Sequence, residues 1–341
     1  MKLCFISGPY KPGRCGITDY VTLLCRELKK HVNICKRITI DRNHSFSDIS
    51  KNIIEADLYS IQFAPYAFSS TGLSKRGLNA LAQSLKNRKT HINFHEIWIG
   101  AYPNASWKEK AIGILQKKEI LKFINTLKPS LITCSNAAAL DRLHQVKINA
   151  KYLYLFGNIP NSNEKEEVPL KDLQVAFFGT PYDKFPYFFL AEKLVEISKS
   201  SQKTVHIKVI GRQRERTGIK EIHRISKING FNISHLGELS ESEISKELKS
   251  SDIGVSTTPY DILGKSGATS AMLEHGLPVL AYDDGDTPQE SLFIPYPFKD
   301  RIFLINDHSS VEKLLQYIEK PRKSFFDGVA HTANKMLELV S

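Results

Sequence analysis

The chain has 341 residues, of which 41% are hydrophobic and 24% are charged, a composition typical of a globular protein with two domains. No stretch approaches the roughly 20 consecutive apolar residues that a membrane-spanning helix needs. The first apolar run ends at Gly8–Pro9, too early for a signal peptide, and a cytoplasmic location is therefore expected.

The positive charge is concentrated in the first half of the chain. Residues 1–156 contain 24 Lys and Arg against 10 Asp and Glu, a net charge of +14, whereas the remainder has a net charge of −3. Such asymmetry indicates a polyanionic partner, such as nucleic acid, an anionic membrane surface or a phosphorylated substrate. A generally lysine-rich proteome explains it nearly as well. Nucleic acid is not expected, because the lysines are not interleaved with an aromatic platform.

Apolar runs of strand length alternate with amphipathic stretches, which is typical of parallel sheets crossed by helices. Strands are expected near 2–6, 34–40, 57–62, 90–95, 130–134 and 151–156, and again near 174–178, 204–210, 232–236, 252–256 and 278–281. The predicted fold is α/β, with an N-terminal Rossmann-like domain at 1–157, a polar linker at 158–172 and a C-terminal Rossmann-like domain at 173–320. A last helix at 321–341 is expected to return to the N-terminal domain.

The first loop of interest joins the first strand to a helix whose apolar face begins at Ile17 and Tyr20. Its glycines, up to Gly16, allow an anion to approach backbone N–H groups at the N-terminus of that helix. Two glycines are also common in an ordinary turn between a strand and a helix. The spacing is not GxGxxG, so a dinucleotide is not indicated.

The segment 94–98, Phe-His-Glu-Ile-Trp, follows a predicted strand. His95 offers a donor or acceptor near neutral pH, beside the carboxylate of Glu96 and an indole wall suited to a sugar. A hydrogen-bonded structural histidine is the alternative.

Residues 107–128 are expected to form a helix. Its apolar stripe contains Ile112, Leu115, Leu121, Ile124 and Leu127, and the lysines around it are Lys108, Lys110, Lys117, Lys118, Lys122 and Lys128. Such a helix can attach reversibly to an anionic membrane surface. A solvated helix that covers the sheet explains the pattern equally well.

Two loops in the second half indicate a phosphate site. Arg212 follows a predicted strand, where it can clamp a diphosphate or lie in a solvated turn. The run 264–279 predicts a helix that begins near Ser266 and Gly267, whose N–H groups hold phosphate oxygens while Lys265 adds positive charge. A nucleoside triphosphatase P-loop is rejected, since the first glycine of its pattern, required five residues before Gly264, is absent and that position is Pro259.

The segments 11–20, 62–68, 94–98 and 264–279 resemble the family 4 (group 1) glycosyltransferases of GT-B architecture. This resemblance implies two sheets that face a central cleft, Gly16 against the donor diphosphate and His95 against the transferred sugar. It also implies a phosphate cradle at 264–267 and a turn at 237–239, with Leu239, against the base. Tyr10, Gln62 and Tyr66 are assigned to the acceptor.

The chain departs from the family pattern at three positions. Leu263 and Ala271 stand where the family commonly has two glutamates, so Glu274 is expected to take over the ribose hydroxyls. Thr180 replaces an arginine, and Lys184 is the nearest basic substitute.

The predicted activity is transfer of a sugar from a nucleotide-diphosphate sugar to a hydroxyl of a glycan, lipid-linked or lipopolysaccharide-type acceptor. His95 and Glu96 are the expected catalytic residues, and Lys184, Arg212 and Lys265 would stabilise the leaving diphosphate without a metal or cofactor. Retention of configuration is implied by the family alone. A nucleotide-sugar epimerase and a non-enzymatic polyanion-binding protein are the alternatives, and peripheral attachment to the inner face of the membrane is a further expectation.

Overall fold

The computed structural model describes residues 1–9, 16–40, 53–101, 105–162, 172–212, 217–283, 297–307, 310–320 and 324–341. The chain divides into two compact units. Unit 1 consists of Met1–Tyr154 and Val329–Ser341, and unit 2 consists of Leu155–Gly328. Residues 163–171 of the expected linker lie outside the described residues.

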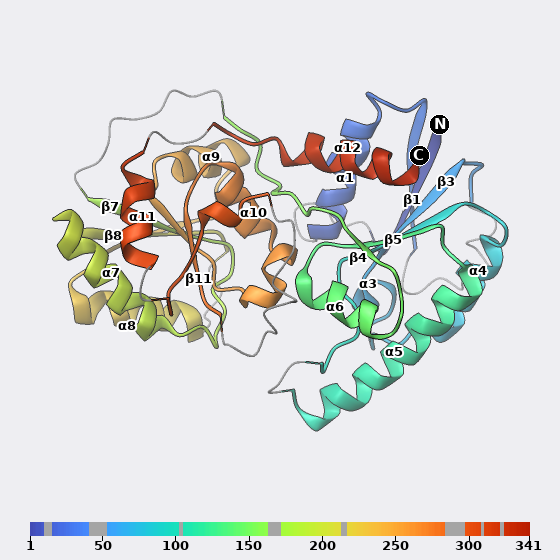
Figure 1. The fold of residues 1–341 in the computed structure, drawn as a ribbon, viewed down its shortest axis with the longest axis horizontal. Coiled ribbons are helices and arrows are strands. Elements are labelled where there is room, and N and C mark those ends of the chain that lie inside the picture. Colours follow the sequence, from blue (N-terminus) through green and yellow to red (C-terminus); the bar gives the residue numbers. More distant parts are fainter. Residues whose placement is uncertain are drawn as a thin grey trace. The chain divides into compact units, whose positions relative to one another are not determined.

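Within its described residues, unit 1 contains a parallel sheet in the order β2-β1-β3-β4-β5-β6 (Figure 1). Its strands are β1 (Lys2–Ser7), β2 (Ile34–Thr39), β3 (Leu58–Phe63), β4 (Thr90–Phe94), β5 (Leu131–Cys134) and β6 (Lys151–Tyr152). Each overlaps a predicted strand. β1, β3, β4 and β5 are buried almost throughout and all but β4 are mainly apolar, whereas the edge strand β2 is only partly buried. β6 is shorter than expected and keeps only two residues of the predicted 151–156.

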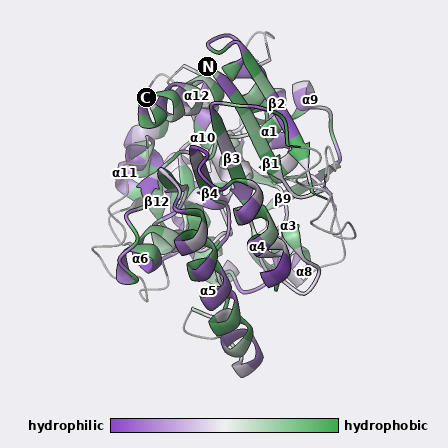
Figure 2. Ribbon diagram, turned by 90° about the vertical axis from the view of Figure 1, so that its right-hand side faces the viewer, coloured by the Kyte–Doolittle hydropathy of each residue, from purple (hydrophilic) through white to green (hydrophobic). Residues whose placement is uncertain are grey.

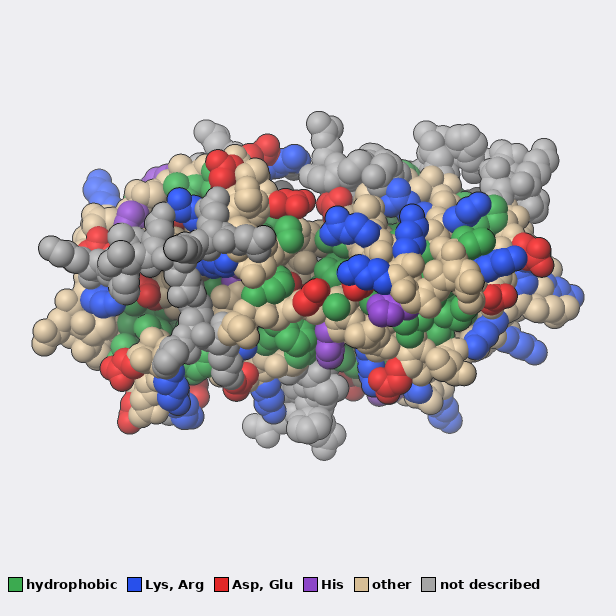
Figure 3. All heavy atoms as spheres, turned by 90° about the horizontal axis from the view of Figure 1, so that it is seen from above, with side chains coloured by type: hydrophobic (Ala, Val, Ile, Leu, Met, Phe, Trp, Pro, Cys, Tyr) green, Lys and Arg blue, Asp and Glu red, His purple; other side chains and the backbone are tan. Residues whose placement is uncertain are grey.

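The helices of unit 1 cover both faces of this sheet. They are α1 (Gly16–Leu28), α3 (Pro65–Phe68), α4 (Lys75–Ser84), α5 (Trp107–Leu127), α6 (Ala137–Gln145) and α12 (Gly328–Val340). α3 to α6 share one apolar core with β1, β3, β4 and β5, whereas α1 packs on the opposite face. α12 is joined to this unit by Thr332, whose Oγ1 donates to the carbonyl of Tyr154 at 3.0 Å. Figure 3 shows one face of the molecule, on which exposed Lys and Arg side chains of unit 1 are numerous.

The described part of unit 2 contains a second parallel sheet, in the order β12-β11-β10-β7-β8-β9. Its strands are β7 (Leu173–Phe178), β8 (Val205–Ile210), β9 (Asn232–Gly237), β10 (Ile253–Val255), β11 (Val279–Ala281) and β12 (Ile302–Leu304). The edge strand β12 has three residues and was not predicted. The predicted α/β fold with two parallel sheets is confirmed.

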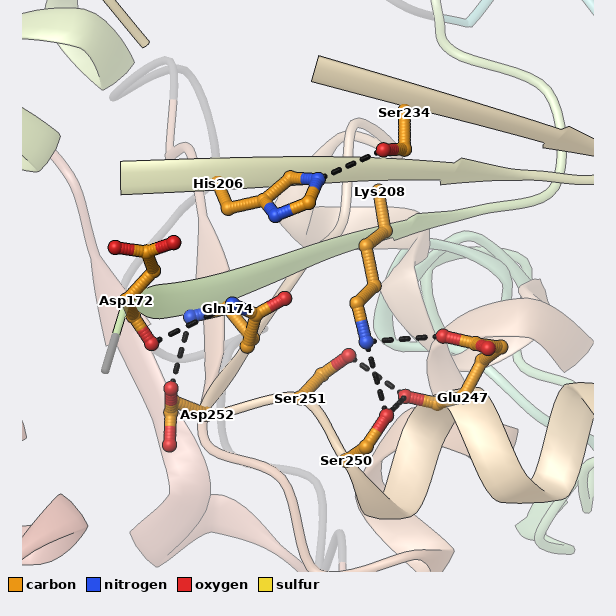
Figure 4. Close-up of polar contacts among 9 residues, drawn as sticks. All are labelled: Asp172, Gln174, His206, Lys208, Ser234, Glu247, Ser250, Ser251 and Asp252. Carbon is orange, nitrogen blue, oxygen red and sulfur yellow. Dashed lines mark hydrogen bonds and ion pairs between the residues drawn. The ribbon is translucent and has the colours of Figure 1, made fainter. Parts of the chain in front are cut away.

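Helices cover both faces of this second sheet (Figure 1). The elements are α7 (Tyr187–Ser201), α8 (Thr217–Asn229), α9 (Glu241–Lys249), α10 (Gly267–Glu274) and α11 (Ser310–Ile318), with short 3₁₀ turns η1 (Tyr260–Lys265) and η2 (Lys299–Arg301). α7, α8 and α11 share an apolar core with the sheet. On the opposite face, the ammonium of buried Lys208 lies 2.9 Å from Glu247 Oε2 and 2.9 Å from Ser250 Oγ, which fixes α9 to β8 (Figure 4). Because the buried ammonium is paired with a carboxylate and a hydroxyl of the same unit, we interpret this cluster as structural.

No helix among the described residues is long and apolar enough to cross a bilayer. Four of the five cysteines are described, and each is a free thiol. Cys15 lies outside the described residues.

Candidate functional site

The strand order of unit 2 marks one place where a ligand is expected. From β7 the chain runs outward through β8 to β9 and then returns to the other side of β7 at β10. The connections therefore diverge between β7 and β10, and in open parallel sheets ligands bind beyond the carboxyl ends of strands at such a switch point.

Two glycines leave bare backbone at this edge of the sheet. Gly179 follows β7 with φ of 89°, and Gly211 follows β8 with φ of 119°, both in the region that favours glycine. A Cβ on Gly179 would lie 3.2 Å from the Ala268 Cβ, and one on Gly211 would lie 3.5 Å from the Gly179 Cα. The ends of β7 and β8 therefore approach each other closely, and the Ala268 methyl group at the start of α10 lies against Gly179.

Ser266 caps α10. Its Oγ accepts from the Thr269 N–H at 3.2 Å and from the Thr269 hydroxyl at 2.8 Å. Since that hydroxyl has donated its one hydrogen, Ser256 at the end of β10 must donate to Thr269 Oγ1 across 2.7 Å. The helix predicted to begin near Ser266 and Gly267 is confirmed, and a hydroxyl chain fixes its start to the end of β10.

The first N–H groups of α10 are available to a ligand. Those of Gly267 and Ala268 donate to no acceptor within the described residues. A Cβ on Gly267 would be no closer than 3.8 Å to Leu155, so a small side chain fits there. Unsatisfied N–H groups and the helix dipole favour an anion at this point.

The predicted basic residues take different positions around this edge. Lys184, in the turn between β7 and α7, and Lys265, at the end of η1, are exposed. Arg212 is half exposed, but its guanidinium is paired with the Glu238 carboxylate. Leu239 is half buried immediately before α9. A diphosphate would compete with Glu238 for Arg212.

The structure places Glu274 inside unit 2 rather than at its surface. Its side chain is 1% exposed, and its Oε1 accepts from the Gly157 N–H at 2.9 Å. A Cβ on Gly328 would approach this carboxylate to 2.1 Å. The side chain thus lies between the backbone at Gly157 and the start of α12, and the expected ribose contact is not available to it.

Unit 1 has its own switch point, between β1 and β3. Gly8 at the end of β1 approaches α3 so closely that a Cβ would lie 2.6 Å from the Ala67 carbonyl. Gly16 is the exposed first residue of α1, and no described atom lies within 4 Å of its Cβ position. Tyr66 in α3 is 36% exposed. Tyr10 lies outside the described residues.

A closed chain of hydrogen bonds crosses β3, β4 and β5 on the face toward α1. Each side chain donates to the next, with separations of 2.8, 2.9, 2.8, 2.8 and 3.0 Å, in the order Gln62, Ser60, His91, Thr133, Asn93 and back to Gln62. We call these five buried residues the polar circuit. Its direction is determined: Thr133 must give its one hydrogen to the Asn93 carbonyl, so His91 donates through Nε2.

His95 branches from the polar circuit. Its Nε2 lies 2.9 Å from Gln62 Oε1, which only accepts, so Nε2 carries the hydrogen. Burial lowers the pKa of His95 to about 4 and that of His91 to about 3, so both are neutral at pH 7. The His95 Nδ1 is then an acceptor, and none of the described residues donates to it. Its ring is 6% exposed and meets the edge of Tyr20 at 5.0 Å between centroids.

Two assigned residues beside His95 differ in exposure. Glu96 is exposed directly after β4. Gln62 occupies the predicted end of β3, but it is buried and its amide is used by Ser60, Asn93 and His95. The expected acceptor contact of Gln62 is therefore not available, and its role is to hold His95.

Several contributors were not selected from the sequence: Gly179, Gly211, Ser256, Thr269 and the rest of the polar circuit. One usable signal was present. Polar residues two apart in otherwise apolar strands, as at Ser60 and Gln62 or His91 and Asn93, lie on the same face. In the described ranges, no group of three or more His, Cys, Asp and Glu side chains could hold a metal ion.

Comparison with solved structures defines the fold as GT-B-like. Anabaena HepE in complex with UDP and glucose matches with a TM-score of 0.55 and 16% identity, over 99% of this chain and 98% of HepE. UDP-GlcNAc 2-epimerase from Methanocaldococcus jannaschii matches with a TM-score of 0.54 and 13% identity, over 100% of this chain and 99% of the epimerase. An alpha-glucosyltransferase (AGT) in complex with UDP matches with a TM-score of 0.53 and 12% identity, over 100% of this chain and 95% of AGT.

No protein-family model and no curated protein sequence matches the chain. At these identities the structural likeness establishes the fold and leaves the activity to the site itself.

Proposed function

We propose that this protein is a glycosyltransferase, related to family 4, that moves a sugar from a nucleoside-diphosphate sugar to a hydroxyl of a glycan, lipid-linked or lipopolysaccharide-type acceptor. The observation that carries the proposal is the switch point of unit 2. There, bare backbone at Gly179 and Gly211 lies near the open N–H groups of α10, an arrangement that could hold a diphosphate.

The leaving diphosphate would be stabilised without a metal. The amides of Gly267 and Ala268 would hold the distal phosphate, and Lys265 and Lys184 would add positive charge from exposed turns. Arg212 would join them if its guanidinium left the Glu238 carboxylate and paired with a phosphate group instead. Because these donors are fixed before the reaction, they would favour the charge that develops on the leaving group.

In unit 1, we assign His95 to the transferred sugar. With Nε2 used by Gln62, its neutral ring would accept a sugar hydroxyl at Nδ1. It would therefore orient the donor rather than deliver a proton. Glu96, Tyr66 and Gly16 are exposed near the same sheet edge and are assigned to polar contacts, to the acceptor and to the diphosphate respectively. Retention of configuration is part of this proposal.

A thermal-shift panel of nucleoside diphosphates and their sugars tests the donor site. UDP is the first probe, since it is present in the similar HepE and AGT structures. A ligand at 100 times its Kd stabilises by about 2.7 kcal/mol, which is readily detected. We expect at least one diphosphate to raise the melting temperature, and a panel without any response would refute the site.

An epimerase is the second candidate, because the M. jannaschii 2-epimerase shares the fold to the same extent. Incubation of the nucleotide-sugar with and without acceptor extracts separates the two. A transferase releases nucleoside diphosphate together with a glycosylated product, whereas an epimerase returns an isomerised nucleotide-sugar with no acceptor present.

A further inference from the structure

Helix α5 has an orientation in unit 1 that is fixed by its buried contacts. Gln116 accepts from the Ile99 N–H at 3.0 Å, and Gly113 approaches so closely that a Cβ would lie 1.9 Å from the Ile99 carbonyl. The buried side is completed by Ile120, Phe123, Ile124 and Leu127. These contacts decide which residues of α5 face outward.

The outward residues differ from those expected. Leu115, predicted on the packed stripe, is 48% exposed, together with Trp107 at 76% and Ile114 at 56%. The helix carries hydrophobic and hydrophilic residues side by side along its length (Figure 2). The buried contacts of Gly113, Gln116 and Ile120 turn the helix so that Ile114 and Leu115 lie outside.

The charges on this outer side have one sign. Lys108, Lys110, Lys118 and Lys122 are exposed there. The two acids of α5 are used elsewhere, since Glu109 accepts from the N–H and hydroxyl of Ser106 and Glu119 accepts from the Ser74 N–H. We call Trp107, Ile114, Leu115 and these four lysines the outer face of α5.

We propose that the outer face of α5 docks onto an anionic lipid bilayer. Lysines attract anionic headgroups, while Trp107, Ile114 and Leu115 enter the boundary between headgroups and acyl chains, where tryptophan is favoured. A nucleic acid would satisfy the lysines but would give the two aliphatic side chains no apolar environment. This surface is independent of the proposed transferase activity, and its test uses no nucleotide.

Co-sedimentation with vesicles of phosphatidylglycerol and phosphatidylcholine tests the proposal. We expect binding that exceeds binding to pure phosphatidylcholine and falls as salt is added. Replacing Lys108, Lys110, Lys118 and Lys122 by Gln should weaken binding by about 100-fold or more. Replacing Trp107, Ile114 and Leu115 by Ser should weaken it by about tenfold or more.

Matched controls come from unit 2. Lys199, Lys220, Lys227 and Lys246 are also exposed, and changing all four to Gln removes the same charge. Phe188 and Phe189 are exposed aromatic residues that can be changed to Ser. Both controls should change binding by less than about threefold. Equal loss in either control would overturn the assignment to α5.

Tryptophan fluorescence gives a second readout. The chain has two tryptophans, and Trp98 is buried. A blue shift on anionic vesicles should therefore come from Trp107, and Trp107→Phe should bind while losing the shift. If the lysine variant loses binding but the serine variant and the emission do not change, the surface binds polyanions such as DNA, and the bilayer proposal is wrong.

Discussion

At the switch point of unit 2, the groups offered to a ligand belong to the backbone, whereas at that of unit 1 they belong to side chains. Gly179, Gly211 and the first turn of α10 present N–H groups and open space. His95 presents its Nδ1, while its Nε2 donates to Gln62 of the polar circuit. The backbone amides of unit 2 do not titrate near neutral pH, whereas what His95 can offer in unit 1 depends on its protonation state.

The difference also concerns how each site is held. The start of α10 is fixed by the short chain of Ser256, Thr269 and Ser266. The polar circuit spans three strands, and each of its hydrogen bonds replaces one that the side chain would make with water if it were exposed. We therefore expect acid to damage unit 1 first, and substitutions at α10 to change ligand affinity more than stability.

The largest expected effect is acid destabilisation of unit 1. His91 and His95 have pKa values lowered by burial to about 3 and about 4, against about 6.5 when unfolded. Between pH 6.5 and 4 the unfolded chain binds more protons, so stability is present above pH 6.5 and lost as the pH falls. The loss should be on the order of several kcal/mol.

Urea unfolding followed by tryptophan fluorescence measures this loss, because Trp98 and Trp107 both lie in unit 1. His91→Gln should flatten the pH dependence while lowering stability at pH 7. A slope that is unchanged in that variant would show that other groups cause the acid sensitivity.

The next effect concerns transfer. His95→Ala removes the acceptor assigned to the sugar, but Gln62 Oε1 still accepts from Asn93. We expect kcat/KM for transfer to fall about 100-fold, or about 2.7 kcal/mol. Diphosphate affinity, measured by calorimetry, should change by less than about threefold. Equal loss of both would make His95 a structural residue.

A smaller effect is expected at α10. Gly267→Asp places a carboxylate beside the proposed phosphate, whereas Gly267→Asn adds nearly the same volume without charge, and a Cβ at this position makes only ordinary contacts. The Asp variant should lose about tenfold or more in UDP affinity by calorimetry, about 1.4 kcal/mol. The Asn variant should stay within about threefold. Similar losses would indicate a steric effect instead of a phosphate.

The sequence predicts the strands well because buried parallel strands are continuous apolar runs. It misses β12, Ile302–Leu304, although 302–305 is also a continuous apolar run. The start of α10 is also predictable, since a serine cap and a glycine precede small residues. These features are determined by residues that are close together in the sequence.

Features that depend on packing are not predictable in the same way. The period of α5 shows that it is amphipathic, but contacts with Ile99 and Gly72 decide that Leu115 faces outward. Glu274 lies on the expected helix, yet the side facing Gly157 is fixed only by the fold. The polar circuit requires the register of three strands, which pairs Ser60 with His91 and Asn93 with Thr133.

The smallest expected effect separates the two functions of Ser266. As the N-cap of α10, its Oγ accepts from the Thr269 N–H, so Ser266→Ala should cost about 1 kcal/mol in the stability of this turn. Ser266→Asp should keep the cap, because an aspartate accepts equally well there. Its charge, however, would lie where a phosphate is proposed.

We therefore expect opposite outcomes in two measurements. Amide hydrogen exchange in α10 should accelerate in Ser266→Ala and stay near wild type in Ser266→Asp, since it reports local opening. UDP affinity should fall more in Ser266→Asp than in Ser266→Ala, because like charges repel whereas a weakened cap leaves the Gly267 and Ala268 amides in place. If the Asp variant binds UDP as the wild type does, α10 does not hold the phosphate, and the backbone site of unit 2 serves only to pack the helix on its sheet.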